Sequence, residues 1–108
     1  MTKADFRTAM RLMRRRDPQA REDGFFLLQP HAAEFVDELI AEFSAEQDHG
    51  LRCWLLELIG DARSPAALPL LAAQLAGEDP ALRDWAVKGL GKLDTREART
   101  LLYEAGER

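Results

Sequence analysis

The stretch DPALRDWAVKGLGKLDTREARTLL, residues 79–102, decides the fold because its pattern recurs along the chain. An Asp followed four positions later by an Arg occurs every 31 residues, as Asp17 and Arg21, Asp48 and Arg52, and Asp79 and Arg83. At the same offset Trp54 matches Trp85, and Gly60 matches Gly91. Similarity at a fixed period of this length is the signature of stacked repeats. The sequence therefore predicts three units over residues 17–108 and one additional element, residues 1–16, in front of them.

Each unit predicts two helices, because helix start signals come in pairs. The repeated Asp can accept hydrogen bonds from the free amides of a first turn, and Pro18 and Pro80 suit the first helical position. Ser64, which precedes a proline, and Asp94, three residues before Glu97, are start signals for second helices. The expected helices are residues 3–15, 18–28, 31–44, 48–59, 65–76, 80–92 and 95–105.

Gly60 and Gly91 are expected to end the first helices of their units, since glycine readily takes the left-handed conformation common there. The alternation of apolar and polar residues that is typical of strands is absent. A helix pair of 31 residues cannot bury both apolar faces by itself, so neighbouring pairs must stack. We therefore predict an all-α, right-handed α-solenoid of three helix pairs, residues 17–47, 48–78 and 79–108, preceded by an N-terminal capping helix at residues 1–16.

The second and third units resemble the short bacterial type of HEAT repeat that also occurs in phycobilin lyases. The first helix of that family carries an Asp, an aliphatic residue with Arg, two small or aliphatic residues and a Leu-Gly pair. Those positions are filled by Asp79, Leu82-Arg83, Ala86-Val87 and Leu90-Gly91, and in the preceding unit by Asp48, Leu51-Arg52, Leu55-Leu56 and Ile59-Gly60. The first unit departs from the pattern at Gly24-Phe25 and Leu28-Gln29. The resemblance implies a HEAT-like solenoid and no particular activity, because this repeat serves many unrelated tasks.

The composition is that of a globular protein without catalytic motifs. Apolar residues make up 46% of the 108 residues and charged residues 31%, and no apolar run approaches the roughly 20 residues of a membrane span. A single cysteine, Cys53, and an N-terminus without a secretion signal predict a cytoplasmic protein. Phosphate-loop, zinc-protease and serine-hydrolase motifs are absent, and His31, Glu34 and Glu38 lack a further metal ligand. We expect no enzymatic activity, cofactor, metal or membrane partner.

The net charge of −4 hides an asymmetry along the chain. Residues 1–21 carry seven cationic and two acidic side chains, whereas residues 22–61 carry ten acidic side chains and one arginine. The run Arg14-Arg15-Arg16 sits at the C-terminal end of the expected front helix, where the helix dipole favours positive charge. Because the acidic remainder would repel a phosphate backbone, nucleic acid is not the expected partner.

The three Asp/Arg pairs can be interpreted in two ways. Arg21, Arg52 and Arg83 could form a row that binds anions, or each could pair with an Asp of its own or the next unit and set the stacking register. The family resemblance implies the second role, which agrees with the usual pairing of partly buried arginines. We expect a structural ladder of Asp17, Arg21, Asp48, Arg52, Asp79 and Arg83.

Two aromatic residues and one uncharged helix are candidate contact sites. Trp54 and Trp85 are expected on neighbouring first helices, where they would either seal the joint between units or contact a partner, since tryptophan is enriched in binding hot spots. The helix over residues 65–76 has no charge, and Gln74 is its only polar side chain. In HEAT-like stacks the second helices line the concave face, so we include Gln74 among the expected partner-binding residues.

The helix over residues 31–44 is strongly acidic, with Glu34, Asp37, Glu38 and Glu42. Glu34, Glu38 and Glu42 are spaced by four residues and would repel one another without a lysine to relieve them. Such a stripe is usually a solvated face, but the repulsion favours a basic partner.

We therefore predict a non-enzymatic module that binds another protein through the concave face, the neighbourhood of Trp54 and Trp85, and the acidic helix. An inhibitor or immunity-type protein that covers a basic surface fits the acidic helix. An accessory subunit of a lyase-like or other enzyme, suggested by the repeat alone, and a structural module that self-associates through residues 65–76 are the alternatives. The expected state is a monomer or a weak homo-oligomer.

Overall fold

The computed structural model describes residues 1–107, and within that range it contains seven α-helices and two 3₁₀ turns. The α-helices are α1 (Lys3–Met13), α2 (Pro18–Leu28), α3 (Val36–Ala45), α4 (His49–Asp61), α5 (Leu68–Leu75), α6 (Pro80–Leu93) and α7 (Arg96–Glu104). The 3₁₀ turns η1 (Gln29–His31) and η2 (Pro65–Ala67) precede α3 and α5. The described residues contain no strand, so the all-α prediction is confirmed.

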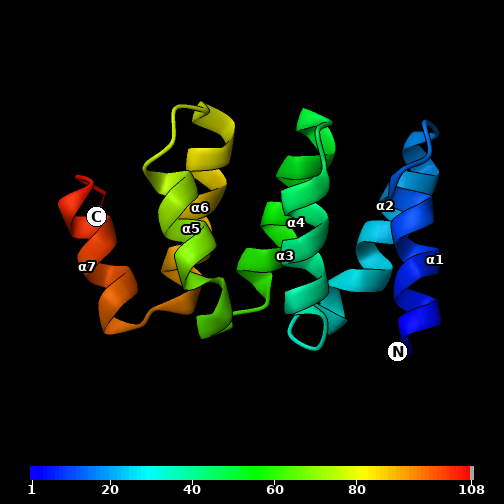
Figure 1. Cartoon of the computed structure of the whole chain (residues 1–108), viewed down its shortest axis with the longest axis horizontal. Helices are drawn as coiled ribbons and strands as arrows, with labels where there is room; N and C mark the ends of the chain where they lie inside the picture. Colours follow the sequence, from blue (N-terminus) through cyan, green and yellow to red (C-terminus); the bar gives the residue numbers. More distant parts are fainter. Residues whose placement is uncertain (108) are drawn as a thin grey trace.

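The helices form a two-layered stack (Figure 1). In this view α1, α3 and α5 lie in front of α2, α4 and α6, and α7 packs against α6 at one end. The termini lie at opposite ends of the long axis of a molecule that measures 38 × 25 × 20 Å. The accessible surface of 6451 Å² exceeds the roughly 6,000 Å² of an average globule of this mass, as expected for an α-solenoid.

The repeated aspartates begin the first helices, as predicted. The side chains of Asp17, Asp48 and Asp79 accept hydrogen bonds from the backbone N–H groups of Gln19, Leu51 and Leu82. Each bond satisfies an amide that has no partner within its own helix. The cap at Ser64 is also present, since its hydroxyl oxygen accepts from the N–H of Ala66.

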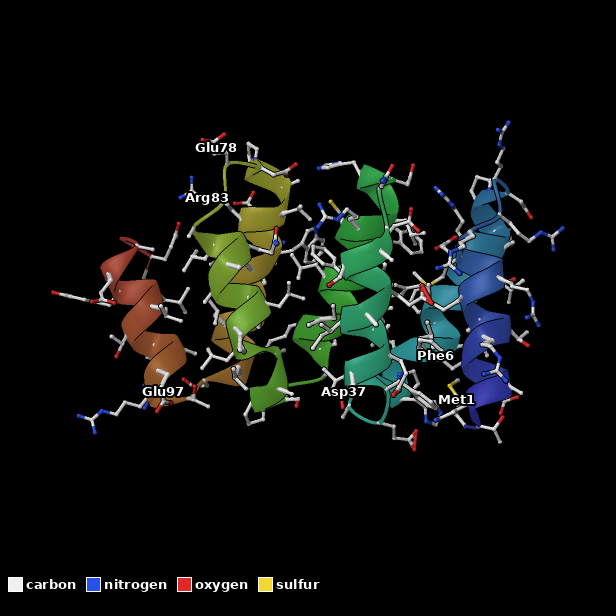
Figure 2. All side chains as sticks on the ribbon, in the orientation of Figure 1. Met1, Phe6, Asp37, Glu78, Arg83 and Glu97 are labelled. Atoms are coloured by element: carbon white, nitrogen blue, oxygen red, sulfur yellow. The ribbon has the colours of Figure 1, made fainter. Side chains whose placement is uncertain are left out.

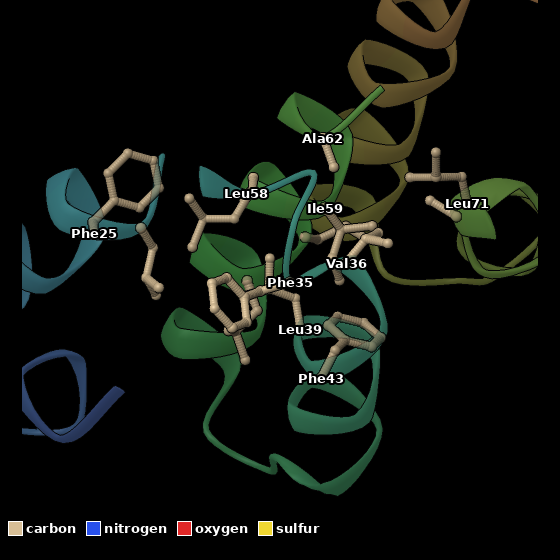
Figure 3. Packing of buried hydrophobic residues seen from close by; sticks show 14 of the residues in the cluster. Phe25, Phe35, Val36, Leu39, Phe43, Leu58, Ile59, Ala62 and Leu71 are labelled. Carbon is tan, nitrogen blue, oxygen red and sulfur yellow. The ribbon is translucent and has the colours of Figure 1, made fainter. Parts of the chain in front are cut away.

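One continuous apolar core runs between the two layers. Leu39 and Phe43 of α3 pack there with Leu58 and Ile59 of α4 (Figure 3). At the N-terminal end the ring of Phe6 from α1 stacks on Phe35, with 5.0 Å between ring centroids. Figure 2 shows Phe6 on the side of α1 that faces the stack. Because α1 contacts the segment leading into α3, it takes the place of a second helix beside α3.

Two second helices begin later than predicted. The expected helix at 31–44 starts only at Val36, because Phe35 leaves the helical conformation (φ −115°, ψ 24°) while its ring stacks on Phe6. The expected helix at 65–76 opens as the 3₁₀ turn η2 and becomes α-helical at Leu68. Pro69 has no N–H to donate to the carbonyl four residues earlier, so the regular α-helical pattern cannot include that bond.

The predicted role of Gly60 and Gly91 is wrong, since both lie inside helices that continue to Asp61 and Leu93. A Cβ atom at Gly60 would lie 2.9 Å from the Cα atom of Gly89, so Gly60 allows α4 and α6 to approach closely. Two non-glycine residues that follow these helices, Arg63 and Asp94, have left-handed φ values of 50° and 51°.

Two helix ends also differ from the prediction. Asp94 was expected to begin the last helix with Glu97, but it is the left-handed C-cap of α6. Thr95 begins α7 instead, and its hydroxyl oxygen accepts a hydrogen bond from the N–H of Ala98. The front helix ends at Met13, two residues earlier than expected.

Candidate functional site

The acidic side chains around α3 are partly neutralised within the chain. Arg14 of the α1 C-cap forms an ion pair with Glu42, and its Nε atom lies 3.7 Å from Glu46 Oε1. Glu34 lies in the turn before α3, with its Oε2 atom 2.9 Å from His31 Nδ1. The expectation of a continuous, unrelieved stripe at 34, 38 and 42 is therefore wrong, because a tertiary contact brings an arginine to it.

Two acidic side chains of α3 remain without an ion pair among the described residues, namely Asp37 and Glu38. Asp37 is exposed, and Figure 2 places it at the N-terminal end of α3. Glu38 is half-buried one residue further along. The unpaired negative charge of α3 is thus concentrated in its first turn.

The three repeat arginines have three different environments. Arg21 donates from Nε to the carbonyl of Met13 at 3.2 Å, and its Nη2 atom lies 3.8 Å from Asp48 Oδ2 of the next unit. The Cζ atom of Arg52 lies 4.1 Å from the ring centroid of Phe43, and its buried Nε has no hydrogen-bond partner in the described chain. Arg83 is exposed and lies at the same edge as Glu78 (Figure 2).

Among the described residues, only the joint between the first and second units therefore contains the expected arginine–aspartate contact, that of Arg21 with Asp48. At the second joint the Nε2 atom of His49 lies 2.8 Å from Asp79 Oδ2. Hydrogen bonds from the N–H of Leu82, and then from His49, hold the pKa of Asp79 below its usual value. Asp17, the first member of the series, caps its own helix. Arginines 21, 52 and 83 do not form a common anion site.

The two tryptophans lie on α4 and α6, in the layer opposite the acidic α3. Trp54 is half-buried, and its ring meets Phe25 of α2 edge-on, with 5.1 Å between centroids. Trp85 is also half-buried, and the Lys88 ammonium lies 4.3 Å from its ring centroid. The structure therefore does not bring the tryptophans and the acidic side chains onto one surface.

A groove of about 480 Å³ runs between α2 and α4 beside Trp54. Its lining residues are Arg16, Pro18, Arg21, Glu22, Phe25, Phe26, Trp54 and Glu57. Phe26 is 58% exposed and contacts Phe25 edge-on at 5.4 Å. A large apolar side chain that stays this exposed beside a second aromatic residue is typical of a contact surface.

Charges are distributed unevenly along this groove. α2 and α4 run in the same direction, since Arg21 lies near Asp48 at their beginnings and Gln29 donates a hydrogen bond to Asp61 at their ends. Arg16 and Arg21 therefore mark one end, and Glu57, on the third turn of α4, lies farther along. Burial raises the pKa of Glu57, and the neighbouring Asp61 carboxylate raises it further.

Sequence reasoning pointed to Trp54 and missed most of this groove. Phe25 and Phe26 could have been noticed, because the family pattern has small or aliphatic residues where unit one has Gly24-Phe25. Arg16 and Glu57 could not, because their shared position depends on which helices become neighbours. Gln74, expected at a contact site, is half-buried on α5 between the exposed Ala73 and the buried Leu75.

The described residues give little support to three other kinds of site, namely a reactive cysteine, a metal site and a membrane-spanning helix. Burial raises the pKa of the Cys53 thiol, and so does the Asp79 carboxylate, which disfavours the nucleophilic thiolate. No group of three or more His, Cys, Asp or Glu side chains in residues 1–107 is placed to hold a metal ion. None of the described helices is both long and apolar enough to cross a membrane.

The two layers of stacked helix pairs define a helical-repeat solenoid whose surface offers a groove and charged faces. A family model described as HEAT repeats matches residues 36–107, two thirds of the chain, and the chain belongs to this family. The resemblance seen in the second and third units is thereby confirmed. No curated protein and no solved structure gives a significant match.

Proposed function

We propose that this chain is a non-enzymatic module that binds another protein, and that the groove between α2 and α4 is part of its contact surface. Family membership supports the first part, since HEAT repeats generally mediate protein–protein interaction and are typically scaffolds rather than enzymes. The exposed ring of Phe26 beside the half-buried Trp54 carries the second part. Such a pair offers apolar area that is released from water when a partner covers it.

The second-helix layer is the other candidate surface. It was expected to bind through the acidic helix and through Gln74, and Asp37 and Glu38 supply unpaired negative charge there. An inhibitor or immunity-type role against a basic protein would use this surface. The pairing of Glu42 with Arg14 leaves it fewer free carboxylates than the sequence suggested.

Comparing variants in a pull-down from the native host tests both surfaces. We expect wild type and Leu27→Ser to capture the same partner and Phe26→Ser to lose it. Leu27 is a suitable control because it is 48% exposed and lies outside the groove lining. The captured protein is then purified and titrated against the same variants.

Two results would redirect the proposal. Loss of the partner only in an Asp37→Lys/Glu38→Lys variant would assign the contact to the second-helix layer. Retention of every partner by all variants would contradict both surfaces. Sedimentation of the purified chain separates self-association from binding to another protein, because only self-association raises the mass as the concentration of this chain increases.

A further inference from the structure

We infer that the occupant of the α2–α4 groove is a short amphipathic segment of a partner protein, with a bulky apolar side chain as its anchor and Asp or Glu beside Arg16. This inference rests on the proposed function and adds the chemistry of the partner to it. Its support comes from the open apolar area of the groove and from the order of charges along it.

The apolar part of the groove has a buried base and open sides. Phe25 is buried and already contacts the rings of both Trp54 and Phe26 edge-on. The open apolar surface therefore belongs to Trp54, which is half-buried, and to Phe26, which is mostly exposed. A volume of about 480 Å³ accommodates one or two large side chains, which suits a short segment better than a flat protein surface.

The positive end of the groove has an unused cation. Arg16 makes no hydrogen bond or ion pair with any residue of the described chain. Arg21 adds a second cation that is held in place by the carbonyl of Met13 and by Asp48. The N-terminal ends of α2 and α4 lie at the same end, but Asp17 and Asp48 already cap them, so the free positive charge there is that of Arg16. A carboxylate of the partner can pair with the Arg16 guanidinium at this end.

The other end of the groove favours the opposite polarity. Glu57 is half-buried and faces a raised cost of ionisation, so a hydrogen-bond donor or cation from the partner would stabilise its charged form. A segment with an acidic residue at one end and a donor at the other can therefore bind in only one direction. The exposed Glu22, which follows Arg21 in the sequence, also lines the groove.

The acidic helix of a second copy of this chain does not fit the description of the occupant. The large apolar side chains of α3 pack on their own core, since Val36, Leu39 and Phe43 are buried and Ile40 is half-buried against them. A second copy could present α3 only through its charged face, without an apolar anchor. α3 of a second copy is therefore not the occupant that the groove fits.

A displayed library of random peptides, each about 16 residues or about four helical turns long, tests the inference on the full chain. We expect the enriched peptides to share a large apolar residue and an excess of Asp and Glu. Their binding is then measured in solution through the fluorescence of Trp54, in a Trp85→Phe background. Arg16→Glu and Phe26→Ser should each weaken binding about tenfold or more, which is a large effect for one contact.

Two matched controls separate the groove from general surface effects. Arg15→Glu makes the same charge change on a residue outside the groove lining, and Leu27→Ser makes a comparable change on an exposed neighbour of Phe26. Both should bind like wild type. Circular dichroism confirms that all four variants keep their helices.

The possible failures are distinguishable. Peptides that depend on Phe26 but carry no acidic excess, or that bind Arg16→Glu and Arg15→Glu equally, overturn the chemistry of the partner and leave groove binding intact. No enrichment, or enrichment that Phe26→Ser does not affect, overturns both this inference and the proposed contact surface. A dimer of wild type that Phe26→Ser abolishes would assign the groove to a second copy.

Discussion

At the scale of single residues, the close spacing of α4 and α6 depends on two glycines, Gly60 and Gly89, which have no side chain. A Cβ atom added at Gly60 would lie 2.9 Å from the Cα atom of Gly89, and one added at Gly89 would lie 2.9 Å from a methyl group of Leu71. Backbone atoms cannot move aside as a flexible side chain can. The close approach of α4 and α6 therefore requires glycine at position 60.

Gly60→Ala should destabilise the protein by about 1–3 kcal/mol, because the added methyl group forces α4 and α6 apart. Gly91→Ala is the matched control, since a Cβ atom there meets nothing within 4 Å. That change should stabilise the chain by up to about 1 kcal/mol, the difference in helix propensity between the two residues. Urea unfolding followed by circular dichroism measures both, and equal effects would contradict the role of Gly60.

Glu57 should make the protein less stable as the pH rises. Its folded-state pKa is raised by burial above the unfolded value of about 4.3, so the folded chain binds the proton more tightly than the unfolded chain. The loss of folding stability caused by ionised Glu57 is absent below about pH 4 and grows as the pH increases through the raised pKa. Glu57→Gln should therefore be more stable than wild type at neutral pH, with a difference that shrinks towards pH 4.

Urea unfolding at several pH values tests this expectation. Glu22→Gln, the same change on an exposed carboxylate of the same groove, is the control. If the two variants shift stability alike at neutral pH, burial of Glu57 is not the cause.

At the scale of helices, the aspartate caps connect sequence to structure most directly. Asp79 caps α6, and its carboxylate also accepts a hydrogen bond from His49 of the preceding unit. Both contacts lower the pKa of Asp79. A carboxyl whose folded-state pKa is depressed stabilises the fold above its unfolded pKa, and that contribution is lost as the pH falls through the depressed value.

Asp79→Ala should lower the unfolding midpoint at neutral pH, because the first turn of α6 loses its cap and α4 loses a contact. The difference from wild type should shrink below about pH 4, as wild type loses the same charge. Asp84→Ala, an exposed carboxylate on the same helix, should change little. Thermal unfolding across pH measures both variants, and a pH-independent loss in Asp79→Ala would contradict the ionic part.

Helix starts were predictable where one residue carries the signal, and helix ends were not where the signal has two meanings. The Asp caps at 17, 48 and 79 follow from local hydrogen bonding alone. Gly60 fits equally well at a helix end and at a close helix crossing, and only the neighbour, Gly89, decides between them. The late start of α3 has the same origin, because Phe35 is placed by Phe6 of another helix.

At the scale of the whole molecule, α1 completes the core. Phe6, Met10 and Met13 are all at most 5% exposed and belong to the same apolar cluster as the later helices. Without them the segment around Phe35 and the α1-facing side of α2, including Gly24, would be uncovered. The front helix therefore belongs to the fold of the repeats, as expected of a cap.

Phe6→Ala should cost about 3–5 kcal/mol, the usual loss for a buried phenylalanine. Because the core is continuous, the fluorescence of Trp54 and Trp85 should shift to a lower urea midpoint together with the circular dichroism signal. Phe26→Ala, the same substitution on an exposed ring, should change stability by less than about 1 kcal/mol. Separate transitions for the two signals would mean that α1 detaches alone.

The candidate site was predictable only in part, because it depends on the arrangement of helices. Trp54 could be singled out, but its neighbours in the groove come from α2, from Arg16 before that helix, and from Glu57 on α4. The acidic stripe was overestimated for the same reason, since Arg14 is distant in sequence and close in space to Glu42. Local patterns predicted the helices, and tertiary contacts determined which charges remain free.

The contacts between units also determine how fast the chain can fold. Apart from the bond of Arg21 to the Met13 carbonyl, the side-chain hydrogen bonds that join one unit to the next, among residues 1–107, link positions 28 to 32 apart, as with Arg14 and Glu42 or Gln29 and Asp61. Each of these longer hydrogen bonds closes a loop of about one repeat. The conformational entropy lost on closing such a loop is small compared with that of a contact between the two ends of the chain. Unfolded chains whose five prolines are all trans should therefore refold within milliseconds in stopped flow, without the slow phase that distant strand pairing imposes on β proteins of this length.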